Sequence, residues 1–403
     1  MIISALITDE THGMGKSICN KLLEKSSTLF LILSGKILIE NSIIALLGKR
    51  IALLALLGIF SVAQAQTVKL PSYQTDLTQT SVSGLSSGAF MAAQFQVAFS
   101  NITVGAGIIA GGPFYCAGSY PFIAPMLTAT TVCMNPQKVG VEPPDASKLL
   151  SAAKIFAQAD LIDDTENLKE QKAYLFSGKS DHTVTTAVVD QTAAFYRLAG
   201  LPAKNIKYET DINAGHAIIT NNNQDVACDV TAAPYINDCD ITQSQVILEH
   251  IYGPLNPPAK VLSGKIIQFD QNEFERSPIT SMSDAAYAFV PKSCDTETCR
   301  VHVAFHGCEQ GAAKIGNQFY TTTGYNEMAD TNNIIVLYPQ VQASKLIPLN
   351  PEGCWDFWGY SSPNPFEPNF YSKQAPQMAA VKEMLDRLSQ PRQQVSTAAS
   401  AMH

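Results

Sequence analysis

Short apolar runs rich in β-branched residues alternate along the chain with longer segments whose apolar residues recur at helical spacing. The strand-like runs cover residues 80–83, 104–110, 173–176, 206–210, 260–270, 285–290, 299–305 and 333–337. The helical segments cover residues 89–99, 188–198, 243–251 and 377–388, and residues 221–258 are otherwise rich in loop-forming residues. This alternation predicts an α/β protein with a mostly parallel central sheet flanked by helices.

The composition excludes a disordered chain and gives no sign of a nucleic-acid-binding one. Of the 403 residues, 46% are hydrophobic and only 15% are charged, which suits a globular protein with a large core. The formal net charge is −8, and no run of Lys or Arg forms a basic patch in the folded region. We therefore expect an uncharged partner or substrate and no binding of nucleic acid.

The N-terminal region carries the pattern of a signal peptide. Lys49-Arg50 precedes an apolar run at 51–60, and Ala63-Gln64-Ala65 follows as a small-residue cleavage site. The sequence therefore predicts a leader over residues 1–65 and a secreted, extracellular or periplasmic protein with no membrane segment after cleavage. Residues 1–45 are interpreted as an over-called start, and an N-terminal anchor formed by the apolar segment 29–47 is the alternative.

Cysteine usage supports export. Cys19 falls in the predicted leader, and the remaining eight cysteines are an even number that lie in sequence-local pairs. Neighbours in sequence predict the four disulfides Cys116–Cys133, Cys228–Cys239, Cys294–Cys299 and Cys308–Cys354. A zinc site is the alternative, but no C-x2-C spacing supports it.

The pentapeptide Gly84-Leu85-Ser86-Ser87-Gly88 lies between a predicted strand and a predicted helix. A G-x-S-x-G sequence in that context forms a tight turn that exposes the central serine as a nucleophile. The backbone amide of the next residue then faces the oxyanion. We therefore expect Ser86 to attack and Ser87 to supply an oxyanion donor, against the alternative of an ordinary Gly/Ser turn.

A serine nucleophile requires a histidine base and a carboxylate that orients it. Asp181 follows the apolar strand at 173–176, and His216 follows the next strand, so the chain order is Ser, Asp, His. Asp181 and His216 are the predicted partners of Ser86, and Asp211 is the rival carboxylate.

The strand at 299–305 ends in His306-Gly307-Cys308. A His-Gly loop after a strand provides the second oxyanion amide in α/β-hydrolases, which makes the Cys308 amide the candidate. In those proteins the loop precedes the serine, whereas here it follows the histidine by roughly ninety residues. The sequence therefore predicts a circularly permuted α/β-hydrolase fold with one catalytic domain at 67–390 and a flexible tail at 391–403.

The motifs around these residues, together with Ala-Gly-Gly-Pro-Phe-Tyr-Cys at 110–116 and Gly-Cys-Trp-Asp-Phe-Trp-Gly-Tyr at 353–360, resemble those of secreted single-domain polyhydroxybutyrate depolymerases. The resemblance covers nearly all of residues 80–390. It implies a permuted α/β-hydrolase fold and a triad of Ser86, Asp181 and His216. It also implies an oxyanion hole at Ser87 and Cys308, and hydrolysis of poly(3-hydroxybutyrate) or its oligomers through an acyl-enzyme intermediate.

An uncharged polyester requires an apolar, aromatic cleft. The aromatic residues assigned to substrate binding are Trp355 and Trp358, which the Cys308–Cys354 bridge holds near the oxyanion loop, and Tyr325. We expect a monomer that needs no metal or cofactor. The alternatives are an esterase acting on other acyl esters, such as feruloyl or acetyl esters, and a catalytically silent surface-binding protein with the same fold.

Overall fold

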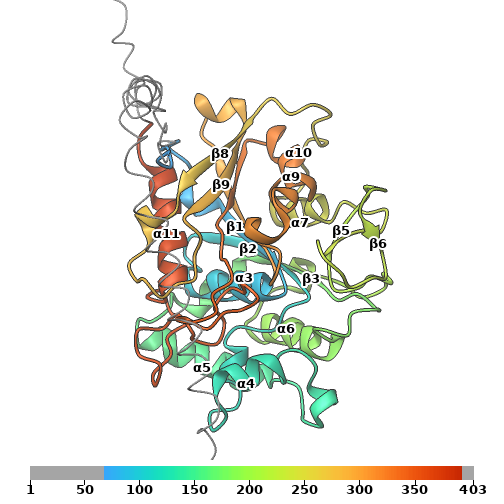
Figure 1. Ribbon diagram of the computed structural model, residues 1–403, viewed down its shortest axis with the longest axis vertical. Helices are drawn as coiled ribbons and strands as arrows, with labels where there is room; N and C mark the ends of the chain where they lie inside the picture. The colour runs from blue at the N-terminus through green and yellow to red at the C-terminus, as the bar shows by residue number, and fades with distance from the viewer. Residues whose placement is uncertain (1–67, 393–403) are drawn as a thin grey trace, which may run out of the picture. The chain divides into compact units, whose positions relative to one another are not determined.

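The computed structural model describes residues 68–392, so the predicted leader and residues 393–403 of the predicted tail lie outside the described part. All eight predicted strands are present, and they form one sheet in the order β4-β3-β2-β1-β10-β11-β9-β8 (Figure 1). Their bounds are β1 Thr80–Leu85, β2 Thr103–Ile109, β3 Lys172–Phe176, β4 Ile206–Glu209, β8 Lys265–Asp270, β9 Ala285–Val290, β10 Arg300–Phe305 and β11 Ile334–Tyr338. The six strands from β4 to β11 in this order run parallel, and β9 is antiparallel to both of its neighbours, β11 and β8. The predicted mostly parallel α/β fold is thus confirmed.

Helices cover both faces of this sheet. Helices α3 and α6 pack against one face near β1, β2 and β3, and α7 and α10 pack against strands from the other. The helices are α3 Ser87–Ala98, α4 Pro125–Thr130, α5 Ala146–Gln158, α6 Thr186–Leu198, α7 Gln243–Tyr252, α8 Ala312–Ile315, α9 Gln318–Thr322, α10 Tyr325–Asp330 and α11 Pro376–Ser389. The pattern in the sequence located α3, α6, α7 and α11, but not α4, α5 or the short helices α8 to α10.

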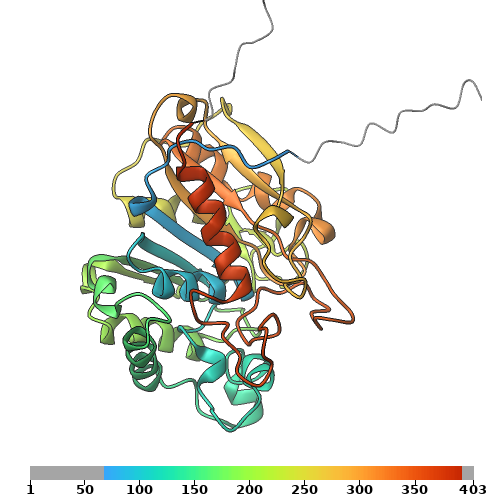
Figure 2. The same ribbon diagram turned by 90° about the vertical axis from the view of Figure 1, so that its left-hand side faces the viewer.

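The two ends of the described chain lie side by side. Figure 2 shows α11 beside the N-terminal segment drawn in blue. The amides of Tyr73 and Thr75 both donate to the carbonyl oxygen of Leu388, at 2.9 and 3.2 Å. This segment and the C-terminal helix therefore pack together on the sheet.

Two predictions about strands need correction. β8 begins at Lys265 and not at residue 260, because the amides of Ser263 and Gly264 donate to the carboxylate of Asp330 instead of a neighbouring strand. Two short strands within the segment expected to be loop-rich, and one directly before it, form a second sheet in the order β5-β7-β6. These are β5 Ile218–Thr220, β6 Val226–Ala227 and β7 Ile236–Asp238. Strands this short carry too little periodicity to be recognised from sequence.

A buried polar network lies on the face of the sheet that α7 and α10 cover. The ring of His302 in β10 bonds to the hydroxyls of Ser81 and Ser83 in β1, at 2.6 and 2.7 Å. Ser81 also bonds to the hydroxyl of Tyr252, and Ser83 to that of Tyr325, at 2.8 and 2.5 Å. Burial lowers the pKa of His302 to about 3, so the ring is neutral and each of its nitrogens has a hydroxyl partner. The network joins β1 to β10 and joins both strands to the helices α7 and α10 that cover this face.

This network makes stability depend on pH. The pKa of His302 rises from about 3 in the folded chain to its ordinary value near 6.5 on unfolding, so the unfolded chain binds the extra proton. The contribution of the neutral His302 ring to the free energy of unfolding is complete above about pH 6.5 and declines by about 1.4 kcal/mol per pH unit as the pH falls toward 3. We expect urea unfolding of His302→Gln to show a shallower loss of stability between pH 7 and 4.5 than the wild type. The exposed His182, replaced by Gln, serves as the control and keeps the wild-type slope, and parallel curves for His302→Gln and wild type would contradict the assignment.

Candidate active site

Ser86 lies on a strained turn between β1 and α3. Its backbone has φ 57° and ψ −123°, a conformation that residues with a side chain rarely adopt. The turn is held because the Ser86 amide donates to the carbonyl of Ile109 at 3.0 Å, and the Ser86 carbonyl accepts from Phe90 at 3.0 Å. The side chain consequently projects from the carboxyl end of a central strand, where open parallel sheets place their binding sites.

The glycines on either side of Ser86 are required by close backbone contacts. A Cβ atom on Gly84 would lie 2.3 Å from the carbonyl oxygen of Gly88. A Cβ atom on Gly88 would lie 2.4 Å from the carbonyl oxygens of both Phe305 and His306. The turn and the end of β10 therefore pack backbone against backbone, with no room for a side chain between them.

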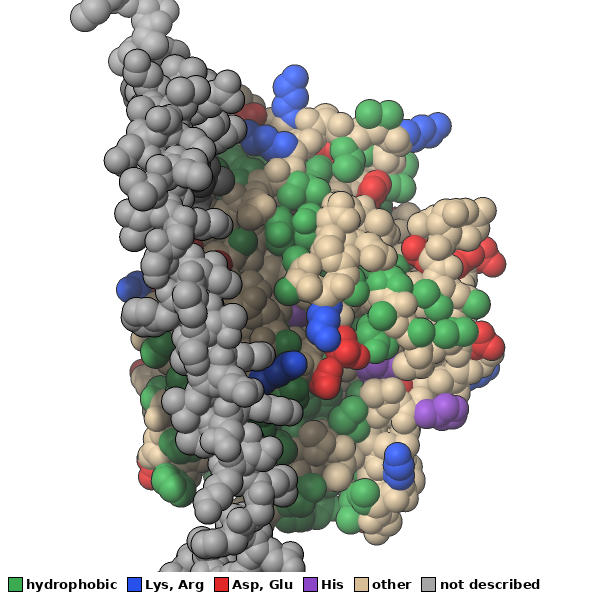
Figure 3. Space-filling view, viewed as in Figure 1, with side chains coloured by type: hydrophobic (Ala, Val, Ile, Leu, Met, Phe, Trp, Pro, Cys, Tyr) green, Lys and Arg blue, Asp and Glu red, His purple; other side chains and the backbone are tan. Residues whose placement is uncertain are grey.

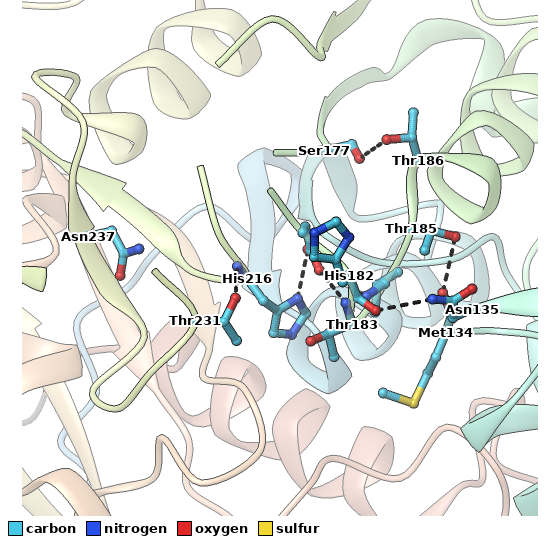
Figure 4. Close-up of polar contacts among 12 residues, drawn as sticks. Met134, Asn135, Ser177, His182, Thr183, Thr185, Thr186, His216, Thr231 and Asn237 are labelled. Atoms are coloured by element: carbon cyan, nitrogen blue, oxygen red, sulfur yellow. Dashed lines mark hydrogen bonds and ion pairs between the residues drawn. The ribbon is translucent and has the colours of Figure 1, made fainter. Parts of the chain in front are cut away.

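Asp181 and His216 form a buried pair. Asp181 Oδ2 lies 2.8 Å from His216 Nδ1, and the two residues are only 5% and 6% exposed. The other carboxylate oxygen accepts the amides of Thr183 and Val184, at 2.8 and 3.0 Å, which fixes the orientation of the carboxylate. The amide of His216 donates to Thr231 Oγ1 at 2.9 Å (Figure 4). With Nδ1 directed at the carboxylate, Nε2 is the nitrogen left for chemistry.

The rival carboxylate is placed elsewhere. The side chain of Asp211 is 95% exposed and pairs with Lys179 at 3.4 Å. Among the described residues, no hydrogen bond links it to His216. The loop that carries Asp181 is tied to the neighbouring segment. The amide and the hydroxyl of Thr185 both donate to the carbonyl of Met134, and Asn135 Nδ2 donates to the carbonyl of His182; Figure 4 shows the two side-chain bonds. Geometry thus favours Asp181 as the partner of His216.

Ser86 and His216 both line one cavity of about 320 Å³. The remaining lining residues are mostly apolar or uncharged: Leu85, Ser87, Phe90, Thr130, Met134, Thr183, Val184, Thr231, Tyr235, Gly307, Cys308, Cys354, Phe357 and Trp358, with Glu309 and Glu352 as the charged exceptions. Phe90 and Phe357 stack with ring centroids 4.1 Å apart. The cavity is suited to an uncharged ligand with apolar groups.

The predicted oxyanion residues Ser87 and Cys308 also line this cavity. Ser87 is the first residue of α3, so its amide is among those that a helix leaves without an intrahelical acceptor. The amide of Gly307 is already engaged with Gln310 Oε1 at 2.7 Å. Of the two amides that follow His306, that of Cys308 therefore remains the candidate donor.

Side chains fix the shape of this loop. His306 Nδ1 donates to the carbonyl of Gly307 at 2.7 Å, and His306 Nε2 accepts the amide of Val341 at 3.1 Å. Burial lowers the pKa of His306 to about 4, so the ring stays neutral and can serve as donor and acceptor at once. His306 is a scaffold for the loop and does not line the cavity.

Gln310 is a functional residue that sequence reasoning missed. It is fully buried, and its Nε2 donates to the carbonyls of Pro234 and Tyr235 at 3.0 and 3.1 Å while its Oε1 holds the Gly307 amide. It thereby connects the oxyanion loop with the loop that carries Tyr235 in the cavity wall. The only signal in the sequence is its position two residues after Cys308.

The three residues assigned to substrate binding differ in position. Trp358 lines the cavity, as expected. Trp355 and Tyr325 do not line it, and the prediction that they contact substrate is wrong in this structure. Trp355 is 0% exposed and packs its ring edge-on against Phe305 at 5.0 Å, and Tyr325 is 1% exposed and belongs to the His302 network. Both rings are buried in the core because they fill space beside β10.

Asp356 is a second missed residue, and it shapes the loop of Trp358. Its Oδ1 accepts the amides of Trp358, Gly359 and Tyr360. Its Oδ2 accepts the amide and the hydroxyl of Ser361. Burial raises the pKa of this carboxyl group, while the hydrogen bonds oppose the shift. A single buried carboxylate thus folds the chain around itself and sets the position of Trp358.

All four predicted disulfides are present: Cys116–Cys133, Cys228–Cys239, Cys294–Cys299 and Cys308–Cys354. Both cysteines of the last pair line the cavity. This bridge attaches the oxyanion loop to the segment that continues into Trp355 and Trp358.

A serine on a strand-to-helix turn, a His–Asp pair after later strands and a mostly parallel sheet define a serine hydrolase of the α/β-hydrolase class. No family model matches the chain. It is 36% identical over 331 residues to a polyhydroxybutyrate depolymerase of Talaromyces funiculosus, an alignment that covers 78% of this chain and 91% of that protein. The chain belongs to the polyhydroxybutyrate depolymerase family.

Further comparisons agree with this membership. The chain is 42% identical over 347 residues to a poly(3-hydroxybutyrate) depolymerase of Delftia acidovorans, covering 84% of this chain but only 65% of that longer protein. The crystal structure of a PHB depolymerase from Penicillium funiculosum superposes with a TM-score of 0.70 and 32% identity, over 81% of this chain and 100% of that one. A PHB depolymerase complexed with an R3HB trimer gives a TM-score of 0.71 at the same identity and coverage.

Gln310 provides a test of the oxyanion loop. In Gln310→Leu the Gly307 amide loses its acceptor and two carbonyls lose their donor, so the Cys308 amide moves and kcat falls about ten- to hundredfold. The control is Gln271→Leu, because Gln271 is also a fully buried amide with three hydrogen bonds to backbone groups, but it lies outside the cavity lining. Steady-state kinetics should show a large loss of kcat only for Gln310→Leu. Equal losses in the two variants would mean that the effect is one of general stability.

The disulfides provide a second test. Opening Cys308–Cys354 by a double substitution to Ser removes a constraint on a 46-residue separation, worth about 4 kcal/mol in the loop-entropy model, and also frees the oxyanion loop. The same change at Cys294–Cys299, with a separation of 5, costs about 2 kcal/mol and lies away from the cavity. We expect the midpoint temperature of thermal unfolding to be lowered in both variants, but kcat per folded molecule to be lowered only in the first. A normal kcat in the first variant would show that the bridge does not position the loop.

Proposed function

We propose that the chain is a secreted serine esterase that hydrolyses poly(3-hydroxybutyrate) or its oligomers, with Ser86 as nucleophile, His216 as base and Asp181 as the orienting carboxylate. The observation that carries this proposal is the 2.8 Å contact of Asp181 with His216, because His216 lines the same cavity as Ser86. Family membership supports the choice of substrate, because the relatives named above are depolymerases of this polyester.

The proposed reaction proceeds in two halves. His216 Nε2 accepts the hydroxyl proton of Ser86 as Oγ attacks the ester carbonyl, and Asp181 stabilises the resulting imidazolium through Nδ1. The amides of Ser87 and Cys308 donate to the oxyanion of the tetrahedral intermediate. His216 then gives its proton to the departing alkoxide, which leaves an acyl ester on Ser86. Water, deprotonated by the same histidine, releases the acid and restores the serine.

The cavity lining supports an uncharged, branched acyl chain. Met134, Phe90, Phe357 and Trp358 present apolar surface around the serine, which suits the methyl and methylene groups of a hydroxyalkanoate repeat. We propose that the polymer contacts the surface of the catalytic domain around this cavity.

We further propose that the fold is a circularly permuted α/β-hydrolase forming one domain over residues 67–390. The order of the sheet supports this, because β1 comes first in the chain but lies in the middle of the sheet, and the late strands β8 to β11 form the half on one side of it. The strand before the oxyanion loop, β10, pairs with the strand before the nucleophile, β1, although it follows some 220 residues later in the chain. A permutation accounts for both observations.

We also propose export and a monomeric state. The four disulfides support an oxidising compartment. None of the helices within residues 68–392 has the length and apolar character of a membrane-spanning segment.

The test is hydrolysis of a poly(3-hydroxybutyrate) suspension and of the 3-hydroxybutyrate trimer, with the products identified. Wild type should clear the suspension, and Ser86→Ala should lose at least about a thousandfold in kcat while keeping its thermal stability. Labelling by a fluorophosphonate should occur in wild type and be lost in Ser86→Ala. Labelling that persists in the variant would identify a different nucleophile, and activity confined to soluble aryl, feruloyl or acetyl esters would replace the polyester assignment. Absence of labelling in the wild type would favour a silent binding protein.

A further inference from the structure

Two carboxylates lie in the wall of the cavity that contains Ser86. Glu309 follows Cys308 and Glu352 precedes Cys354 by two positions, so the disulfide brings both to the same wall. The amide of Glu309 also donates to the carbonyl of Glu352 at 2.7 Å. The acidic pair is thus fixed to the oxyanion loop by one covalent bridge and one backbone hydrogen bond.

Both carboxylates act on the same neighbour in the cavity wall. Glu309 Oε2 accepts the hydroxyl of Tyr235 at 3.0 Å. Burial, that hydrogen bond and the negative charges of Glu309 and Glu352 together raise the pKa of the Tyr235 phenol. The fields of the two glutamates therefore overlap inside the cavity.

Little positive charge offsets this pair. Among the described residues that line the cavity there is no Lys or Arg. Lys314, outside the lining, approaches Glu309 Oε1 only to 3.6 Å, and both side chains are close to half exposed. Water screens such a partly exposed pair, and it weakens the repulsion by the same carboxylate too, so the expected effect on specificity is modest. Figure 3 shows red acidic side chains directly below a blue side chain near the middle of this face, next to green apolar surface.

The proposed substrate has charge at one place only. A poly(3-hydroxybutyrate) chain ends in a hydroxyl at one terminus and in a carboxylate at the other. When Ser86 attacks an ester bond, the carboxylate terminus always belongs to the departing alcohol. Cleavage of the bond nearest to that terminus brings the carboxylate close to the cavity, and cleavage further along the chain leaves it far away. Coulomb repulsion falls with distance and with salt, so it distinguishes these two cases.

We propose that Glu309 and Glu352 are specificity-determining residues that disfavour cleavage next to a free carboxylate terminus and so direct the enzyme to ester bonds inside the chain. This inference rests on the proposed function. It implies that the shortest acid oligomers are poor substrates relative to their neutral esters. It also implies that the anionic monomer product is a weak inhibitor, because the same repulsion opposes its binding.

The test compares one bond in two charge states. The substrates are the 3-hydroxybutyrate dimer acid and its methyl ester, measured at pH 7.5 and low salt, and the quantity is the acid-to-ester ratio of kcat/KM at the bond between the two repeats. We expect this ratio to rise about two- to fivefold in Glu352→Gln and in Glu309→Gln, and further in the double variant. Gln keeps the acceptor for Tyr235. In wild type the ratio should rise when the ionic strength is raised to about 0.5 M.

Glu170→Gln is the matched control, because it removes the same charge from an exposed position. Glu170 lies just before β3, at the amino ends of the parallel strands and thus at the end of the sheet opposite the cavity. This variant should keep the wild-type ratio. Ratios in the Glu309 and Glu352 variants equal to that of the control, with both substrates cleaved, would overturn this inference and leave the proposed function intact. If wild type cleaves neither the dimers nor the polymer, the proposed function fails and this inference fails with it. The salt dependence of wild type decides the matter if either variant does not fold.

Discussion

The contact between the turn at Ser86 and the end of β10 is the constraint on which the site depends. At Gly88 the backbone of the turn is so near to the carbonyl groups of Phe305 and His306 that a methyl group would lie 2.4 Å from their oxygens. This approach sets the turn of Ser86 beside the loop that follows β10. The separation of these two backbone segments is fixed by direct contact, so it cannot relax through side-chain rotation, and the rest of the site is built around it.

Around this contact, buried polar side chains hold neighbouring strands and loops in place through hydrogen bonds. His302 joins β1 to β10 beneath the turn, His306 and Gln310 hold the oxyanion loop, and Asp356 holds the loop of Trp358. Each of these side chains is almost fully buried and makes at least two hydrogen bonds. A satisfied polar group in a core costs little, but its loss leaves its partners unpaired, so these residues specify one loop geometry more strictly than apolar packing does.

Much of the fold could be predicted from the sequence because β2, β10 and β11 are runs of five to seven residues whose burial is nearly complete. β1 is equally buried but has the sequence Thr-Ser-Val-Ser-Gly-Leu, and it is recognisable mainly through the Gly-x-Ser-x-Gly motif at its end. The strands β5, β6 and β7 have two or three residues and are stabilised by a disulfide and by Asn237, whose Nδ2 donates to three carbonyls, so no periodic signal exists for them. Helix α5 went unrecognised although Asp145 caps it through the amides of Ser147 and Lys148.

The candidate site was predictable where chemistry leaves a local motif. The glycines around Ser86, the order of Asp181 and His216 and the His-Gly loop all have such motifs. Ser86, His216 and Cys308 line one cavity, and Asp181 bonds to His216 behind its wall. Aromatic residues carry no such information. Trp355 and Trp358 are three positions apart in the same loop, yet the first is core and the second lines the cavity, because Asp356 turns the chain between them. Asp356 acts through backbone amides of its own loop, which no motif announces. Gln310 acts through carbonyl groups of another loop, and a sequence does not show which loops will meet.

The position of β1 in the middle of the sheet has a consequence for biosynthesis. One of its two neighbours, β2, follows within a few residues of α3, but the other, β10, is synthesised some 220 residues later. Until then one side of β1 has unpaired amide and carbonyl groups and the hydroxyls of Ser81 and Ser83 lack the histidine that bonds them. An open strand edge of this kind promotes association between chains. A nascent chain that already contains Ser86, Asp181 and His216 is therefore both inactive and prone to aggregate. It can become an enzyme only after the last third of the chain, with β10, has been synthesised.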